Sequence, residues 1–277
     1  MAIPIDIEDA WQISPSRNYN IPFNYIYDKQ LQRWVPETKQ TNLNSQSVID
    51  SAVAFVRKFG SNEDVSSSVS DAAPETVWDG SNLYVFPPDT GISLQISSAN
   101  AGDTQQVIIE GLDQDFLPKS WTGNLNGTTH VNLEGRWTRV FRGYNNGSTS
   151  FAGAIDLHAS GNASPSYLKI TNTDNQTLMA VYTVPANYTG YLVSYNISAH
   201  NSQSSSDIGY NIKLKTREFG KVFRTQCSDS VATSDSMNKD LSFPIRLNPK
   251  TDIKFDVVSA NGNNGSVDVE FNIALLA

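Results

Sequence analysis

The chain has 277 residues, which is enough for two domains of ordinary size, and its formal net charge is −8 at pH 7. A phosphate-binding surface needs a surplus of Lys and Arg, so this charge argues against a nucleic-acid partner. No apolar run approaches the roughly 18 residues of a membrane span, and the N-terminus lacks the features of a signal peptide, so we expect neither. The single cysteine, Cys227, cannot form an internal disulfide, which indicates assembly in a reducing compartment.

Residues 1–43 combine many aromatic side chains with several prolines and show no sustained periodicity. A segment this aromatic is not typical of a disordered tail, yet it has no continuous amphipathic element with which to fold alone. We therefore predict an extended arm that buries its aromatic side chains against a partner. The alternative is an N-terminal strand that returns to its own domain. The aromatic residues are Trp11, Tyr19, Phe23, Tyr25, Tyr27 and Trp34.

Residues 45–59 are predicted to form one amphipathic helix, capped near Ser45 and ended by Gly60. Its apolar stripe includes Val48, Val53, Val56 and Phe59. This is more apolar surface than a solitary surface helix needs, so we expect it at a subunit contact in a homo-oligomer, with a trimer favoured. Residues 61–75 are polar and Ser-rich, so the segment 44–75 is interpreted as a helix and a linker.

Two later segments, 76–162 and 163–277, alternate short β-rich runs with turn dipeptides. In residues 92–97 apolar and polar side chains alternate, as in a strand with one buried face. Residues 251–259 and 266–275 alternate in the same way around an Asn-Asn-Gly turn, which predicts a β-hairpin. The sequence therefore predicts an all-β fold, with two antiparallel β-sandwich or jelly-roll domains preceded by the arm and the helix.

Familiar catalytic and metal-binding patterns are not found. His130, His158 and His200 fall in different predicted strands without the spacing of metal ligands. No nucleophile elbow and no phosphate-binding loop occurs. We expect no cofactor, no metal and no enzymatic activity. One alternative stays open, because a pair of carboxylates assembled from distant loops would leave no signature in the sequence.

One binding hypothesis rests on aromatic residues in the first β segment. Trp121, Trp137 and Tyr144 could form a platform on which sugar rings stack. The alternative is that these side chains alternate into the core of a sandwich.

Four motifs carry a resemblance to a known family: PETVWDG at 74–80, IEGLD at 109–113, TVPANYTGYL at 183–192 and KTDIKFDV at 250–257. Together they resemble virion structural proteins of tailed phages of marine bacteria, including short-tailed phages of cyanobacteria. The resemblance spans residues 50–277. It implies a non-enzymatic particle component that is assembled in the cytoplasm of a bacterial host. The motif residues look structural: Gly80, Gly111 and Gly190 at turns, and Trp78 and Phe255 in cores.

The resemblance and the composition together favour a capsid decoration or cement protein that docks on the shell through its arm and helix. The expected partners are the major capsid protein or other virion proteins. The alternative is a tail, connector or fibre-associated virion protein that binds a host glycan. Neither role requires a membrane or a nucleic acid.

Overall fold

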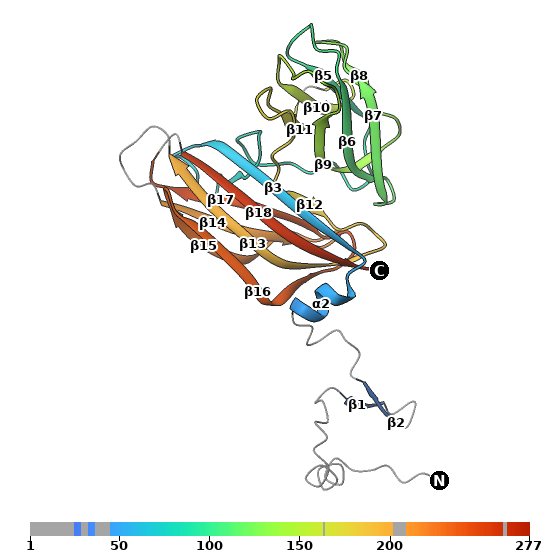
Figure 1. Cartoon of the computed structure of the whole chain (residues 1–277), viewed down its shortest axis with the longest axis vertical. Coiled ribbons are helices and arrows are strands. Elements are labelled where there is room, and N and C mark those ends of the chain that lie inside the picture. Colours follow the sequence, from blue (N-terminus) through green and yellow to red (C-terminus); the bar gives the residue numbers. More distant parts are fainter. Residues whose placement is uncertain (1–24, 29–32, 37–44, 163, 202–208, 263–264) are drawn as a thin grey trace.

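The computed structural model describes residues 25–28, 33–36, 45–162, 164–201, 209–262 and 265–277 (Figure 1). Within this part, all pairings between named strands are antiparallel and the one helix is α2 (Ser45–Ser51). The prediction of an all-β antiparallel fold is therefore confirmed. None of the described helices is long and apolar enough to cross a bilayer.

A short hairpin precedes the helix. β1 (Tyr25–Asp28) pairs with β2 (Arg33–Pro36), and the register places Tyr27 opposite Trp34. Three aromatic residues of the predicted arm, Trp11, Tyr19 and Phe23, lie outside the described residues.

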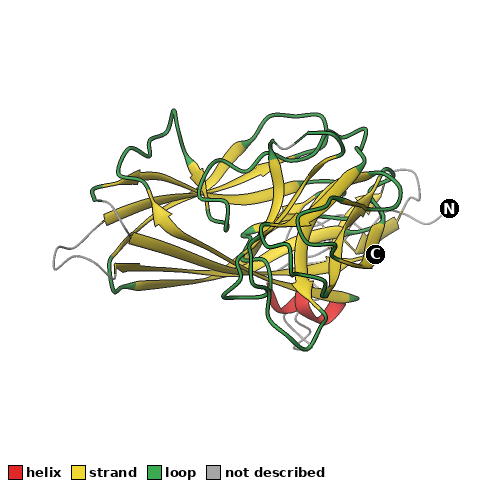
Figure 2. Cartoon of the chain, turned by 90° about the horizontal axis from the view of Figure 1, so that it is seen from above, coloured by secondary structure: helices red, strands yellow, loops and turns green. Residues whose placement is uncertain are grey.

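The larger of two β units, called the main unit here, consists of two sheets. One has the order β16-β13-β18-β3 and the other β12-β17-β14-β15, with β4 also paired to β17. The strands are β3 (Ala54–Val65), β4 (Glu75–Thr76), β12 (Val181–Thr183), β13 (Thr189–Asn201), β14 (Gly209–Arg217), β15 (Arg224–Ala232), β16 (Ser236–Leu247), β17 (Asp252–Ala260) and β18 (Gly265–Leu276). Figure 2 shows these strands stacked in layers.

Leaving out the two-residue β4, the pairing of the other eight strands of the main unit is nested. The first strand, β3, pairs with the last, β18; β12 pairs with β17, β13 with β16, and β14 with β15. This is the pattern of one long hairpin that has been rolled up, so consecutive strands mostly alternate between the two sheets. Side chains from both sheets, including Ile212, Phe255 and Phe271, fill one shared core between them.

The smaller unit, called the insert, lies between β4 and β12 in the chain and beside the main unit in space (Figure 1). Its sheets have the orders β11-β10-β5-β8 and β7-β6-β9. Leu94, Ile109, Trp137 and Leu157 contribute to its separate core. The strands are β5 (Leu94–Ser98), β6 (Gln106–Asp113), β7 (Pro118–Asn124), β8 (Val131–Asn132), β9 (Trp137–Asn145), β10 (Ile155–Ala159) and β11 (Ser166–Ile170).

Strands grouped together by the sequence are distributed differently in the structure. β11 was expected among the later strands but pairs with β10 of the insert. The predicted hairpin of β17 and β18 is wrong, because these strands lie in opposite sheets and share only the core between them. An alternation of period two tells which face of a strand is buried, but it does not tell which strand is its neighbour.

The predicted helix over residues 45–59 is also wrong beyond its first half. α2 ends at Ser51, and β3 begins at Ala54 and pairs with β18 along most of its length. The segment is rich in Val and Phe, which suit a strand as well as an apolar helical stripe. Gly60 is therefore not a helix cap. A Cβ atom there would lie 2.0 Å from the backbone nitrogen of Ala180, so this glycine permits a close crossing of chain segments.

The motif glycines were expected at turns, but Gly111 lies in β6 and Gly190 in β13. A Cβ atom on Gly111 would lie 2.1 Å from the carbonyl oxygen of Arg139 in the neighbouring strand. Close backbone approach, and not a turn conformation, explains the absence of a side chain at this position. The motif aromatics Trp78 and Phe255 are buried, as expected.

Two short segments connect the insert to the main unit and pair with each other, forming what we call the neck. The amide of Ala180 donates to the carbonyl of Val77 at 2.9 Å, and the amide of Asp79 donates to the carbonyl of Leu178 at 3.1 Å. The amide of Leu178 in turn donates to Oδ2 of Asp79 at 2.7 Å. The entry and exit of the insert are thus held side by side.

A buried ionic contact, called the seam, joins the two units next to the neck. Arg139 of β9 donates from Nε to Oδ1 of Asp252 of β17 at 2.6 Å and from Nη2 to Oδ2 at 3.0 Å. Both side chains are only 2% exposed. Asp252 also accepts from Thr183 Oγ1 at 2.6 Å and from Arg217 Nε at 2.8 Å. Each oxygen of this carboxylate therefore has more than one donor.

Aromatic rings enclose the two guanidinium groups of the seam. The Cζ atoms of Arg139 and Arg217 lie 5.4 and 5.3 Å from the centroid of the Phe86 ring. Arg139 also lies 4.9 Å from Phe116, and Arg217 lies 4.8 Å from Phe223. These rings exclude water from the ion pairs, which strengthens the attraction and raises the penalty for a missing partner.

Loss of one seam partner should be costly. We expect Asp252→Ala to lower the free energy of unfolding by about 3–5 kcal/mol, because it leaves Arg139 charged and buried with the partly exposed Asp89 as its one remaining ion partner. Urea denaturation measures the effect, and Glu270→Ala, which removes the exposed ion pair with Arg57, is the control with an expected change below about 1 kcal/mol. The double variant Arg139→Met/Asp252→Leu should recover most of the loss. A loss below about 1 kcal/mol in Asp252→Ala would contradict this role.

The neck should make stability depend on pH. Burial raises the pKa of Asp79 from 3.8 to about 8, so the folded state keeps a proton that the unfolded state releases. This contribution is fully present below pH 3.8 and is lost as the pH rises through 8. Asp79→Asn should lack it, so the stability of the wild type relative to the variant should fall by at most about 1.4 kcal/mol per pH unit.

Urea denaturation at several pH values between 4.5 and 6.5 tests this difference. Burial also lowers the pKa of Lys58 to about 7 from 10.5, but its dependence lies above this window. Burial lowers the pKa of His158 as well, and that effect cancels in the comparison because both proteins contain the residue. A difference that stays constant with pH would show that Asp79 is ionised in the folded protein.

Candidate docking surface

The helix α2 crosses one end of the outer face of the sheet β16-β13-β18-β3 (Figure 1). Val48, a residue of this helix, is fully buried against the sheet and packs with Tyr191 of β13 and Ala274 of β18. Ser45 at the start of the helix donates from Oγ to the carbonyl of Leu241 in β16. The point where residues 1–44 join the described fold is therefore fixed on this sheet.

Large apolar side chains around the helix remain exposed. Val53 and Phe55, which follow the helix, are 61% and 60% exposed, and Phe59 further along β3 is 44% exposed. Phe243 on the opposite edge strand is 74% exposed. We call the set Ile49, Val53, Phe55, Phe59 and Phe243 the docking surface. An exposed apolar group of this kind on a folded domain is typical of an interaction site.

Local backbone features present these residues. β3 is an edge strand. Phe55, Arg57 and Phe59 are spaced two residues apart, so all three side chains lie on its outer face, with Arg57 between the two rings. Arg57 pairs with Glu270 at 2.7 Å. On the other edge the register slips between Leu192 and Ser194 of β13, so four residues of β16, 241–244, bulge out and expose Phe243.

Some of the residues predicted to bind a partner are exposed and others are buried. Val53 and Phe59 are exposed as the hypothesis requires, whereas Val48 is buried and Val56 is half-buried against the main core. Ile49 and Phe55 belong to the predicted apolar stripe of residues 45–59 but were not singled out as partner-binding residues. Phe243 was not predicted, because nothing in the sequence marks the bulge that exposes it.

The predicted aromatic platform for sugars is not formed. Trp137 is fully buried in the core of the insert. Trp121 lies opposite Ile109 and Tyr144 lies opposite Ile108 of β6, so they occupy opposite faces of that sheet. Three aromatic residues on two faces and in the core cannot stack on one ligand.

Two histidines that the sequence separated are neighbours. The rings of His130 and His158 are 5.0 Å apart between centroids and nearly perpendicular. His130 directly precedes β8 and His158 lies in β10, and both of these strands pair with β5. In the part of the chain that the structure describes, no group of three or more His, Cys, Asp or Glu side chains is placed to hold a metal ion.

Comparisons with known proteins give no family. No family model and no curated protein matches the chain. Among solved structures, the PBSX exported protein XepA aligns over 90% of this chain and 93% of its own at 8% identity, with a TM-score of 0.20. Two structures of infectious bursal disease virus, the Gt and Gx strains, align over 81% and 80% of this chain and 77% and 76% of theirs, at 12% and 10% identity, with TM-scores of 0.20 and 0.21. Similarities at these TM-scores carry no argument about fold or role.

The docking surface should be dispensable for folding. We expect Phe55→Ser/Phe59→Ser to change the free energy of unfolding by less than about 1 kcal/mol, because both side chains are exposed, Phe55 to 60% and Phe59 to 44%. Val48→Ser, which places a hydroxyl under the helix, should cost about 2 kcal/mol or more. Chemical denaturation of the three proteins measures both effects. A large loss in the double phenylalanine variant would assign these rings to the fold and not to a partner.

Proposed function

We propose that this chain is a non-enzymatic structural protein of a phage virion, and that it decorates the capsid by docking through its N-terminal arm and the docking surface. The observation that carries the proposal is the position of that surface. Exposed apolar side chains lie on α2, directly after it and on both edge strands of the sheet that it covers, and residues 1–43 precede this helix in the chain. An arm and a surface that meet in this way can act as one attachment region.

The strand order of the main unit supports the proposal. Without β4 and numbered 1 to 8 along the chain, its strands have the orders 1-8-3-6 and 2-7-4-5 in the two sheets. Eight antiparallel strands in two sheets with nested pairing favour a jelly roll, an architecture that viral capsid proteins use repeatedly and that lectins also use. Because one fold serves many functions, this argument is an analogy, and the attachment region carries more weight.

The contacts that join the two units support a role in cohesion. The neck and the seam hold the two units together through paired backbone segments and a carboxylate shared by two arginines. The resemblance in motifs such as PETVWDG and KTDIKFDV agrees with this interpretation, because these segments supply the neck residues Val77 and Asp79 and the seam residue Asp252. The motifs that suggest a virion protein therefore lie where the units are joined.

We further propose that the chain assembles as a homotrimer on the particle, with the major capsid protein or another virion protein as its partner. Burial of the docking surface and of the arm aromatics would give the apolar centre that permanent interfaces have. The alternative is a position in the tail, connector or fibre.

Co-sedimentation with virions assembled without this chain tests the proposal. The full chain and Val85→Ser, a control at an exposed residue outside the surface, should bind equally. A chain lacking residues 1–43 and the variant Phe55→Ser/Phe59→Ser should remain folded by circular dichroism and lose binding by about tenfold or more, which corresponds to about 1.4 kcal/mol. Undiminished binding of both altered proteins would overturn the proposed attachment region.

The same sample separates the two locations. A reconstruction of the reconstituted particle should show density on the capsid shell, at a copy number that follows the shell subunits. Density confined to the tail or connector, with the copy number of a ring, would replace decoration by the alternative.

A further inference from the structure

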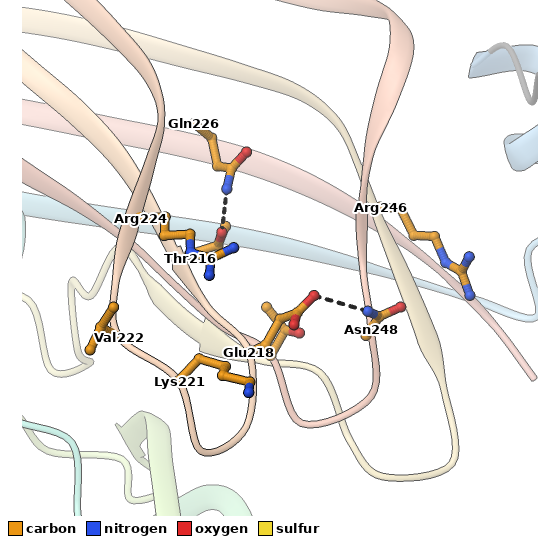
Figure 3. Close-up of a pocket in the computed structure, with 9 residues that line it drawn as sticks. Thr216, Glu218, Lys221, Val222, Arg224, Gln226, Arg246 and Asn248 are labelled. Atoms are coloured by element: carbon orange, nitrogen blue, oxygen red, sulfur yellow. Dashed lines mark hydrogen bonds between the residues drawn. The ribbon is translucent and has the colours of Figure 1, made fainter. Parts of the chain in front are cut away.

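A small polar pocket lies at the end of the main unit, between the turn that joins β14 to β15 and the end of β16 (Figure 3). Its volume is about 80 Å³, which is the size of one small functional group and not of a whole ligand. The residues that bear on its chemistry are Thr216, Glu218, Lys221, Arg224, Asn248 and Thr251. None of them belongs to the docking surface or to the seam.

The pocket is cationic in an acidic protein. Lys221 and Arg224 come from the β14–β15 turn and its edge, and neither forms an ion pair within 4.0 Å in the part of the chain that the structure describes. Glu218 is the single carboxylate in the lining. The chain as a whole has a net charge of −8, so two unpaired cations at one small pocket are a local reversal of charge.

Hydrogen bonds between the polar side chains of the lining hold them in place. The side-chain amide of Asn248 donates to Oε1 of Glu218 at 3.1 Å, and Gln226 donates to Thr216 Oγ1 at 2.7 Å (Figure 3). These contacts orient Glu218 and Thr216 at the pocket. The carboxylate of Glu218 keeps acceptor capacity beyond its one bond from Asn248.

One buried hydroxyl lacks a partner. Thr251 lines the pocket, is 2% exposed, and its Oγ1 forms no hydrogen bond with the described residues. A buried hydroxyl without a partner costs about 1–3 kcal/mol, so such groups in folded proteins are uncommon. This oxygen of Thr251 has almost no exposed surface, so it lies behind the pocket lining and is not itself a contact for a ligand.

We propose that this pocket binds an acidic sugar, with the sulfate or carboxylate group of the sugar held by Lys221 and Arg224. A free oxyanion would meet the same cations but would be repelled by Glu218. A sugar also carries hydroxyl groups, and these can donate to Glu218 and accept from Asn248. The lining holds three cations, Lys221, Arg224 and Arg246, together with one carboxylate and neutral groups, so it fits a ligand that carries both an anion and hydroxyls. This inference is independent of the proposed docking role, because the two sites share no residue.

Isothermal titration calorimetry at constant ionic strength tests the site with three probes: a disaccharide carrying one sulfate, its unsulfated parent and inorganic sulfate. The wild type should bind the sulfated disaccharide about tenfold or more tightly than either other probe. Lys221→Gln and Arg224→Gln should each weaken that binding by about tenfold, as expected for the loss of one charge-assisted contact. Lys169→Gln, which removes a cation from the insert, is the matched control and should change nothing.

Two further variants distinguish a built site from general attraction of anions. Glu218→Gln should weaken binding of the sulfated disaccharide and strengthen binding of inorganic sulfate, because it removes both an acceptor and a repulsive charge. Thr251→Val should leave both binding of the disaccharide and thermal stability unchanged, since it removes a buried hydroxyl that has no partner in the protein and that a ligand cannot reach. Equal affinity for inorganic sulfate and the sulfated disaccharide, equal losses in Lys169→Gln, or no binding of the disaccharide would each overturn the proposal.

Discussion

The carboxylate of Asp252 is the contact on which the arrangement of the two units depends. It lies at the first residue of β17 and accepts hydrogen bonds from Arg139 in the insert and from Arg217 and Thr183 in the main unit. A buried carboxylate is expensive unless it is fully paired, and here the pairing requires both units to be in place. Such a contact adds little net stability compared with a hydrophobic one, but it penalises every other orientation of the insert. Its contribution is to specificity of arrangement.

The neck complements the seam. The insert leaves the main unit after β4 and returns at β12, and the hydrogen bonds between residues 77–79 and 178–180 hold these two crossings together. Ends that lie close together allow a complete domain to be placed within another one without disturbing the sheets of the host. The neck fixes the distance between the units, and the aromatic rings around Arg139 and Arg217 fix their rotation.

Much of the fold could be predicted from sequence, and the failures have a common cause. The alternation at Ile253, Phe255 and Val257 correctly marks a strand with an apolar buried face, although the polar residues on its other face, such as Asp252 and Asp256, are buried as well. The partner of a strand depends on residues far away in the chain, so the predicted β17–β18 hairpin and the placement of β11 failed. The helix predicted for residues 54–59 was wrong for a related reason. A run of Val and Phe fits a strand as well as a helix, and pairing with β18 decides between them.

The candidate sites follow the same rule. The apolar character of Val53 and Phe59 was visible in the sequence, whereas the exposure of Phe243 depends on a bulge that no local pattern announces. Arg139, the polar pocket and the histidine pair are assembled from strands that are distant in sequence, so no spacing rule could have found them. A β protein places its chemistry at contacts of high sequence separation, and these are what sequence patterns describe least well.

The nested pairing has a consequence for synthesis. β3 is made early but its partner is β18, so that sheet of the main unit cannot close until the last strand has left the ribosome. The strands of the insert lie within residues 94–170 and pair only among themselves, so they are complete about a hundred residues before β18 emerges. The insert can therefore fold first, while β3, with its exposed phenylalanines, remains without a paired strand. A nascent chain in that state is exposed to aggregation, and slow closure of long-range pairs prolongs the interval.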